Sequence, residues 1–318
     1  MTAGDILPVF PAFIITAVAA HFLIPWLRKK KMDQTERVEG VASHLKKAGT
    51  PTMGGLAILL GIIVGTLFFM PGHPEQGAIL FLTAGFGVIG FLDDFLKVFK
   101  RRSDGLYDWQ KLLLEIAVTG VFLAIMIRGN SISLEMKVPF TADKMVSLGW
   151  FGVPFAFLVI LATVNGVNFT DGVDGLASSV TSVVAAYFAV ISLMKEGGAI
   201  TPVCLAVLGS LLAFLLYNSY PAKVFMGDTG SLALGGFVAG AAYMTQRTLY
   251  ILIIGVIYAI ELLSVALQVT YFKLTHGKRI FKMTPIHHSF ELSGWSETRI
   301  VATFTIITIL TCTLMLPF

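Results

Sequence analysis

Charged residues and cysteine are both scarce in this sequence. Asp, Glu, Lys and Arg together make up 13% of its 318 residues, about half of their share in ordinary soluble domains. The two cysteines, Cys204 and Cys312, lie inside apolar runs, so they provide neither a disulfide framework nor a thiolate metal site. This composition excludes a disordered protein, a typical nucleic-acid-binding protein and a water-exposed enzyme. The net charge is only +4, so any basic binding surface is local.

Apolar residues make up 56% of the chain and gather in long runs. One helical crossing of a bilayer needs about 20 predominantly apolar residues. The first run is not a cleaved signal peptide, because no basic residue precedes it and four follow it at 28–31. We therefore expect an all-α integral membrane protein that forms a single polytopic domain over residues 1–318. The ten predicted spans lie near 6–27, 52–70, 78–97, 110–128, 149–165, 176–193, 199–218, 231–246, 249–273 and 297–316.

Lys and Arg are divided unequally between the two sets of loops that ten spans define. Eighteen of the 23 fall in the set that contains residues 28–51 and 274–297, and five fall in the other set. Because loops rich in Lys and Arg face the cytoplasm, we expect both termini outside. One outer loop, near residues 131–140, alternates polar and apolar side chains. This period of two predicts a short β-hairpin outside the membrane.

Three acidic clusters lie at the predicted inner ends of spans. They are Asp93–Asp94, the pair Asp171 and Asp174, and Asp228 within Gly227–Gly230. Each cluster has an ordinary explanation: a solvated helix end, a pair on one helical face that caps a span, and a turn before a span. Three such clusters on one face of a chain so poor in charge instead indicate a shared site. Carboxylates and substrate phosphates are the ligands that Mg2+ prefers, so we expect Mg2+ there.

His287, His288 and Glu291 provide an alternative set of metal ligands. Two adjacent histidines are a poor zinc pattern, because no second histidine follows at a spacing of four. The basic stretch 278–282 lies just upstream, so the histidines suit contacts to an anionic substrate. Two solvated loop histidines are the other interpretation.

A glycine-rich segment and two acids inside predicted spans are further candidates. Residues 47–55 permit close backbone approach at a helix N-terminus, where an anion is favoured. They lack the Lys-Ser or Lys-Thr of a Walker motif. Glu115 and Glu261 lie within spans, where an acid is a functional candidate by default. Because the sequence shows no partner for either acid, we assign both to structure.

Five motifs carry a resemblance to a known family. They are GTPTMGG at 49–55, FLDDFLK at 91–97, NFTDGVDGLA at 168–177, VFMGDTGSLALGG at 224–236 and PIHHSFELSGWSE at 285–297. With them the chain resembles the polyprenyl-phosphate N-acetylhexosamine-1-phosphate transferase superfamily over essentially its whole length. The first and last motifs point to the phospho-N-acetylmuramoyl-pentapeptide transferase branch. That branch usually has three consecutive histidines, and here Ser289 takes the third position, so no histidine role is carried over to it.

The resemblance implies a ten-span fold with a cytoplasmic active site and an Mg2+-dependent transfer reaction. Phospho-N-acetylmuramoyl-pentapeptide would move from UDP to undecaprenyl phosphate, giving lipid I and UMP for peptidoglycan synthesis. Asp228 matches the Mg2+ ligand, and the implied catalytic residues are Asp93, Asp94, Asp228 and His287. The implied substrate-binding residues are Lys47, Thr52, Lys97, Lys111, Asn168, Asp171, Gly172, Asp174, Asn218, Phe225, Gln268, His287 and His288, with Arg101 as a further phosphate contact. Phe225 would stack on uracil.

The resemblance also implies the partners and the place of the protein in the cell. The partners are UDP-MurNAc-pentapeptide, undecaprenyl phosphate and the lipid bilayer, and no nucleic acid is expected. Nucleoside inhibitors such as tunicamycin would bind the protein, and a homodimer is a further expectation. The location is the bacterial cytoplasmic membrane. One alternative is a related transferase that uses UDP-N-acetylglucosamine for teichoic acid or O-antigen lipids. An ion-coupled transporter is the other, but its acids would lie near the midplane of paired repeats, whereas here the acidic clusters gather at one surface and no repeat is found.

Overall fold

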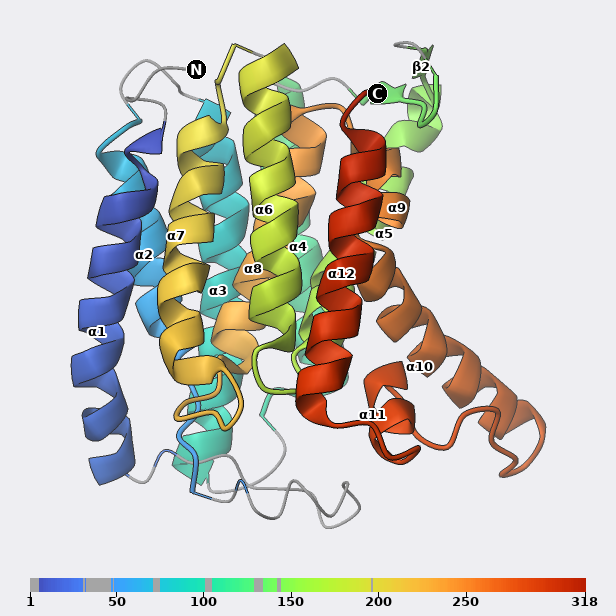
Figure 1. The fold of residues 1–318 in the computed structure, drawn as a ribbon. Helices are drawn as coiled ribbons and strands as arrows, with labels where there is room; N and C mark the ends of the chain where they lie inside the picture. Colours follow the sequence, from blue (N-terminus) through green and yellow to red (C-terminus); the bar gives the residue numbers. More distant parts are fainter. Residues whose placement is uncertain are drawn as a thin grey trace.

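The computed structural model describes residues 6–30, 32, 47, 49–70, 75–100, 105–128, 134–141, 144–195 and 197–318. Most of the long helices run side by side (Figure 1). The long helices are α1 (Val9–Lys29), α2 (Gly55–Leu67), α3 (Glu75–Lys100), α4 (Asp108–Arg128), α5 (Gly152–Thr170), α6 (Leu176–Lys195), α7 (Thr201–Asn218), α8 (Gly227–Met244), α10 (Val256–Leu274) and α12 (Glu297–Met315). The short elements are β1 (Met136–Lys137), β2 (Met145–Val146), η3 (Gly149–Phe151), η4 (Thr248–Tyr250), α9 (Ile251–Ile254) and α11 (Ile286–Glu291).

A helix occupies each of the ten predicted stretches. Among the described residues, eight helices are long and apolar enough to cross a membrane. The other two are α2, which has 13 residues, and α8, which has 18 and begins with the polar stretch Gly227–Gly230. The prediction of a helical chain with many apolar spans is therefore confirmed.

The outer surface of the bundle is apolar, as a bilayer requires. On α1, the side chains of Phe10, Ile14, Val18 and Phe22 repeat every fourth residue and are all exposed. Exposed apolar stripes of this size are unusual in soluble monomers. They identify the face of α1 that meets lipid.

The helix α8 forms the centre of the bundle. Every residue from Thr229 to Tyr243 is buried, and the helix packs against α3, α5 and α2. Most of these residues are glycine, alanine or serine, which let neighbouring membrane helices approach closely. The N-terminus of α8, with Asp228, is therefore enclosed by other helices.

The helix that follows α8 is broken at Gly255, between α9 and α10. Beyond this break, α10 leans away from the other helices, and α11 lies beside it (Figure 1). Glycine is a common cause of such a kink. One side of α10 is exposed and apolar, whereas the other side is buried against the rest of the protein.

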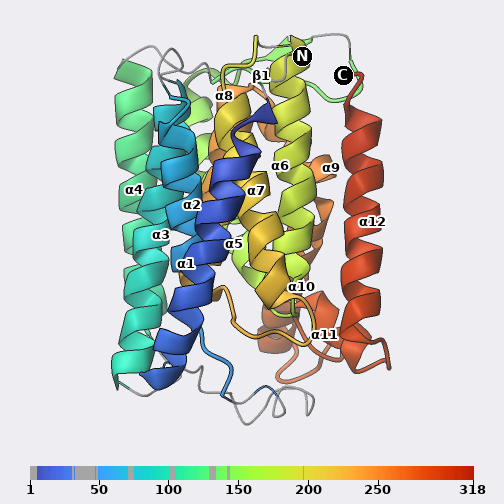
Figure 2. The same ribbon diagram turned by 60° about the vertical axis from the view of Figure 1, so that its left-hand side comes forward.

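The two ends of the bundle differ in what they carry. The start of α1 and the end of α12 lie at the same end as β1 and β2, while α11 and the connection from α7 to α8 lie at the other (Figures 1 and 2). β1 pairs with β2 in an antiparallel sheet. β1 falls inside the predicted hairpin near 131–140 and β2 lies beyond it, while residues 131–133 are outside the described residues.

Candidate active site

Asp94 caps the N-terminus of α8. Its Oδ1 accepts the backbone N–H of Asp228 at 3.1 Å, and its Oδ2 accepts the N–H and the hydroxyl of Thr229 at 2.9 and 2.6 Å. A carboxylate is favourable there because the first N–H groups of a helix have no intrahelical partner. α3 continues to Lys100, and Asp93 and Asp94 are both buried. The interpretation of this pair as a solvated helix end is therefore wrong.

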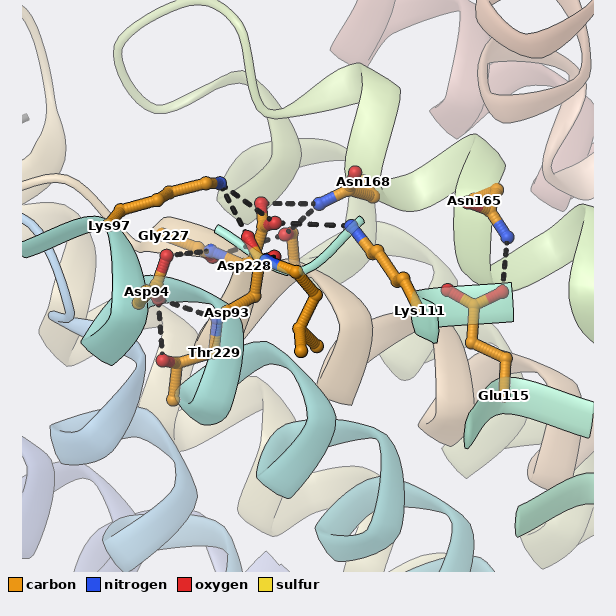
Figure 3. A network of polar contacts seen from close by, with 12 residues as sticks. Asp93, Asp94, Lys97, Lys111, Glu115, Asn165, Asn168, Gly227, Asp228 and Thr229 are labelled. Carbon is orange, nitrogen blue, oxygen red and sulfur yellow. Dashed lines mark hydrogen bonds and ion pairs between the residues drawn. The ribbon is translucent and has the colours of Figure 1, made fainter. Parts of the chain in front are cut away.

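The cap of α8 comes from Asp94 and not from Asp228. The Asp228 carboxylate bonds instead to side chains on three other helices (Figure 3). Its Oδ2 lies 3.1 Å from the ammonium groups of both Lys97 and Lys111. Its Oδ1 accepts the side-chain amide of Asn168 at 3.0 Å. Burial alone would raise the pKa of Asp228, but the two lysines outweigh it and hold that pKa well below its ordinary value. Asp228 is therefore ionised at neutral pH.

The carboxylates of Asp93, Asp94 and Asp228 form a group that fits a divalent cation. One ligand atom from each lies within 4.8 Å of the others, which is close enough for the three carboxylates to bind one metal ion. Asp93 is also held in place, since its Oδ2 is 2.6 Å from Lys97 and its Oδ1 accepts the N–H of Leu106 at 2.8 Å. Hard carboxylate oxygens suit Mg2+ rather than a thiolate-preferring metal. We call these three aspartates the carboxylate centre.

A second acidic region lies in the turn 171–175 between α5 and α6. The prediction that Asp171 and Asp174 share a helical face is wrong, because both lie in this turn. Asp174 Oδ1 is 2.7 Å from Lys47 Nζ, and its Oδ2 accepts the N–H of Ala222 at 2.8 Å. Lys47 also lies 2.6 Å from Glu297 at the start of α12. The turn thus joins the segment before α2, the α7–α8 connection and α12.

Two pKa shifts distinguish the charges of this turn. Burial would lower the pKa of Lys47, but Asp174 and Glu297 outweigh it and raise that pKa above its ordinary value. Burial, together with repulsion from Asp228, Asp94 and Asp174, raises the pKa of Asp171 well above its ordinary value. Lys47 therefore carries a positive charge at neutral pH. The negative charge of the carboxylate centre acts on Asp171.

The glycine-rich segment 49–55 packs against the approach to α8. Phe225 donates its N–H to Pro51 O at 2.8 Å and accepts the N–H of Gly54 at 2.9 Å. A Cβ on Gly55 would collide with the backbone of Gly230. The predicted close approach therefore occurs between α2 and α8, within the protein.

Two predicted binding residues lie around this packed segment. Thr52 is buried beside the start of α8, where a Cβ on Gly227 would lie 2.8 Å from its hydroxyl. The Asn218 amide donates to Val224 O at 3.0 Å and accepts from Ser178. Asn218 therefore fixes the chain that presents the half-buried Phe225.

The histidine motif forms the short helix α11. His287 is fully buried, with Nδ1 3.1 Å from Glu261 Oε1, and His288 Nδ1 is 2.7 Å from Glu291. The interpretation of two solvated loop histidines is therefore wrong for His287. Glu261, which the sequence left without a partner, lies beside this histidine.

Other predicted residues are placed as follows. Gln268 Oε1 accepts the N–H groups of Ile280 and Phe281 at 3.0 Å each, so it ties the loop before α11 to α10. Ser289, at the position of the family's third histidine, bonds to the backbone of Met283. Glu115 accepts the amide of Asn165 at 2.8 Å, as Figure 3 shows. Arg101 lies outside the described residues.

Sequence reasoning did not select Glu297 or Glu261 as site residues. Glu297 closes the motif at 285–297, so its place in that motif was a signal that could have been used. Glu261 had no sequence signal beyond being an acid inside a span.

Known proteins resemble this chain over most of its length. Residues 77–246 match the family model described as glycosyl transferase family 4, and residues 47–59 match phospho-N-acetylmuramoyl-pentapeptide-transferase signature 1. The phospho-N-acetylmuramoyl-pentapeptide-transferase of Clostridium perfringens strain 13 is 48% identical over 305 residues, covering 95% of this chain and 94% of the relative. The same enzyme of Acetivibrio thermocellus is 46% identical over 306 residues, covering 95% and 92%. That of Caldicellulosiruptor bescii is 45% identical over 311 residues, covering 98% and 96%.

Proposed function

This chain belongs to the phospho-N-acetylmuramoyl-pentapeptide-transferase family, and we propose that its carboxylate centre is where the family's reaction takes place. The protein transfers phospho-N-acetylmuramoyl-pentapeptide from UDP to undecaprenyl phosphate, which gives lipid I and UMP for peptidoglycan synthesis. One diphosphate bond breaks and another forms, so no ATP-binding motif is needed. The observation that carries the proposal is the half-buried Asp228 carboxylate, which lies among two buried carboxylates and two ammonium groups.

The carboxylate centre is suited to phosphoryl transfer because that chemistry depends on positioning and charge neutralisation. Asp228, with Asp93 and Asp94, would hold Mg2+, which when bound neutralises the charge that develops on a diphosphate. Lys97 and Lys111 have long flexible stems, so their ammonium groups can turn from Asp228 to substrate phosphates.

The attacking group needs no strong base. The phosphate of the lipid, like other phosphomonoesters, has a second pKa of about 6, so it is mostly dianionic at neutral pH. Asp93 then orients the attack, while Asp94 holds the N-terminus of α8 and with it Asp228. A covalent aspartyl intermediate is the less favoured route, because Asp94 already accepts three hydrogen bonds.

The turn 171–175 and the α7–α8 connection form the nucleotide side of the site in this proposal. Asp174 and Lys47 would contact the uridine, and Phe225 would stack on the base. Asn168 and Asp171 lie between this side and the carboxylate centre and would line the diphosphate pocket. Asn218 and Gln268 act through the loops that they fix.

The protein is a bacterial multi-pass membrane protein. We propose ten crossings, with α2 and α8 completing the eight longer helices, and both termini outside. The carboxylate centre would then face the cytoplasm, where UDP-linked substrates are made. A cysteine introduced at the exposed Lys278 tests this, since the natural cysteines are buried. It should resist membrane-impermeant thiol reagents in intact cells, and labelling from outside would contradict the topology.

The proposal also names the substrate. One assay distinguishes it from the two alternatives, a transferase that uses UDP-N-acetylglucosamine and an ion-coupled transporter. The purified protein in detergent is offered undecaprenyl phosphate with either UDP-MurNAc-pentapeptide or UDP-N-acetylglucosamine. We expect UMP and lipid I from the first nucleotide only, and loss of activity when a chelator removes Mg2+. A lipid product from UDP-N-acetylglucosamine would assign the chain to the related branch, and no lipid product from either would reject transferase activity. Inhibition by tunicamycin and a dimer on native mass analysis are further expectations.

A further inference from the structure

The buried face of α10 carries a stripe of polar side chains. Glu261, Ser264 and Gln268 are buried at spacings of three and four, so they lie on one side of a helix whose other side is exposed and apolar. Gln268 holds the backbone of the loop before α11. An acid within a membrane helix is costly and is a functional candidate by default. The stripe therefore connects α10 to the α11 region through polar groups.

Glu261 meets His287 in a closed environment. Both side chains are fully buried, and Oε1 of Glu261 lies 3.1 Å from Nδ1 of His287. Apart from this contact, neither side chain has a hydrogen-bond partner among the described residues. Burying either group alone would cost free energy, and the contact between them offsets part of that cost. A carboxylate beside Nδ1 favours the proton on that nitrogen and fixes the orientation of the ring.

The other edge of the ring lies against the turn 171–175. A Cβ on Gly172 would collide with Nε2 of His287. The ring is therefore in direct contact with the backbone between Asp171 and Asp174. Because Asp174 binds Lys47, the orientation of this ring sets the position of the nucleotide side of the site.

We propose that Glu261 is a positioning residue for nucleotide recognition, acting through His287 on the turn 171–175. This inference rests on the proposed function. The chain of contacts is Glu261 to His287, His287 to Gly172, and Asp174 to Lys47. It does not pass through Asp228, so it predicts an effect on the nucleotide substrate and little effect on Mg2+ or the lipid phosphate.

The test compares Glu261→Leu and Glu261→Gln in the full-length protein. Leucine removes the carboxylate, and we expect KM for UDP-MurNAc-pentapeptide to rise about tenfold or more, since small misplacements in a site cost up to about a hundredfold. The KM for undecaprenyl phosphate and the Mg2+ midpoint should change less than about twofold by the same argument. Glutamine keeps an oxygen that accepts a bond from Nδ1, so it should restore most of the nucleotide affinity.

Tyr258→Phe is the matched control, because Tyr258 is one turn away on α10, is buried and bonds to Thr181 at 2.8 Å. It should lower the melting temperature without changing either KM. If Glu261→Leu does not fold, Gly172→Ala approaches the ring from the other side and should raise the same KM selectively. Equal losses for both substrates and Mg2+, or no change in any of them, would overturn the inference. A wild-type protein that does not use UDP-MurNAc-pentapeptide would instead reject the proposed function.

Discussion

The carboxylate centre and the turn 171–175 are both acidic, yet they are built differently. The three aspartates of the centre come from α3 and from the first turn of α8, and two ammonium groups from α3 and α4 lie against them. The turn has no regular structure of its own and is held by contacts to distant segments. Sites built on helices are more precisely held than sites on loops. This difference supports the proposal that the bond-making chemistry takes place at the centre and substrate recognition at the turn.

The charge states of the two regions point in the same direction. The pKa of Asp228 is held low, so this residue remains an anion available to a cation. Burial and repulsion from the neighbouring aspartates raise the pKa of Asp171 instead. The low pKa of Asp228 supports the proposal that the carboxylate centre binds a cation.

The largest expected effect is that of Asp228→Asn. The variant keeps the shape of the side chain, and α8 keeps its cap from Asp94, so the fold should be unchanged. If Mg2+ contributes several kcal/mol, kcat should fall by at least about a thousandfold, because each 1.36 kcal/mol is a factor of ten. Steady-state kinetics across a Mg2+ titration measures this. Activity within a few-fold of wild type, with an unshifted Mg2+ midpoint, would transfer the metal to another carboxylate.

Lys111→Met should have the next largest effect. A hydrogen bond to a charged group contributes about 1.5–3 kcal/mol, so kcat/KM should fall by about ten- to 150-fold. The control is Lys273→Met, which removes an exposed lysine from the last turn of α10. If both variants lose activity equally, the effect comes from net charge and not from the position of Lys111.

Phe225→Ala tests the nucleotide side directly. Base stacking on an aromatic ring is worth about 1–3 kcal/mol, so KM for the UDP substrate should rise by about five- to 150-fold. Affinity for the lipid phosphate should be little changed. An unaltered nucleotide KM would show that Phe225 serves only to pack the start of α8.

Asp174→Asn should have the smallest effect of the four. Lys47 would lose one carboxylate partner and keep Glu297. We expect KM for the UDP substrate to rise about tenfold, since one charged hydrogen bond is weakened, while kcat is retained. A loss in kcat as large as that of Asp228→Asn would remove the distinction between the two regions.

The sequence predicted the positions of the helices well, because bilayer thickness sets how long an apolar run must be. It also placed Asp93, Asp94 and Asp228 at the same ends of spans, and these three do meet, whereas Asp174 lies in a separate turn and pairs with Lys47. It did not predict that Asp94 caps α8 or that Glu297 pairs with Lys47. These contacts join residues 135 and 250 positions apart, and they depend on helix rotation, which an apolar run does not specify.

One local prediction failed for an identifiable reason, and one contact had no signal in the sequence. The pair Asp171 and Asp174 has helical spacing, but Gly175 has a φ of +79° and ends the turn before α6. Glu261 could not be matched with His287 from the sequence, because the break at Gly255 redirects α10 toward α11. In both cases a glycine determined where the polar residues lie.

The central claim is that the carboxylate centre binds the metal and the turn 171–175 does not. Mn2+ can take the place of Mg2+ and is observed directly by electron paramagnetic resonance, without turnover. Titrating Mn2+ into the wild-type protein, Asp228→Asn and Asp174→Asn should show binding that Asp228→Asn weakens by at least about tenfold, because a charged ligand is lost. Asp174→Asn should bind Mn2+ as the wild type does. Weakened binding in Asp174→Asn, with wild-type binding in Asp228→Asn, would contradict the claim.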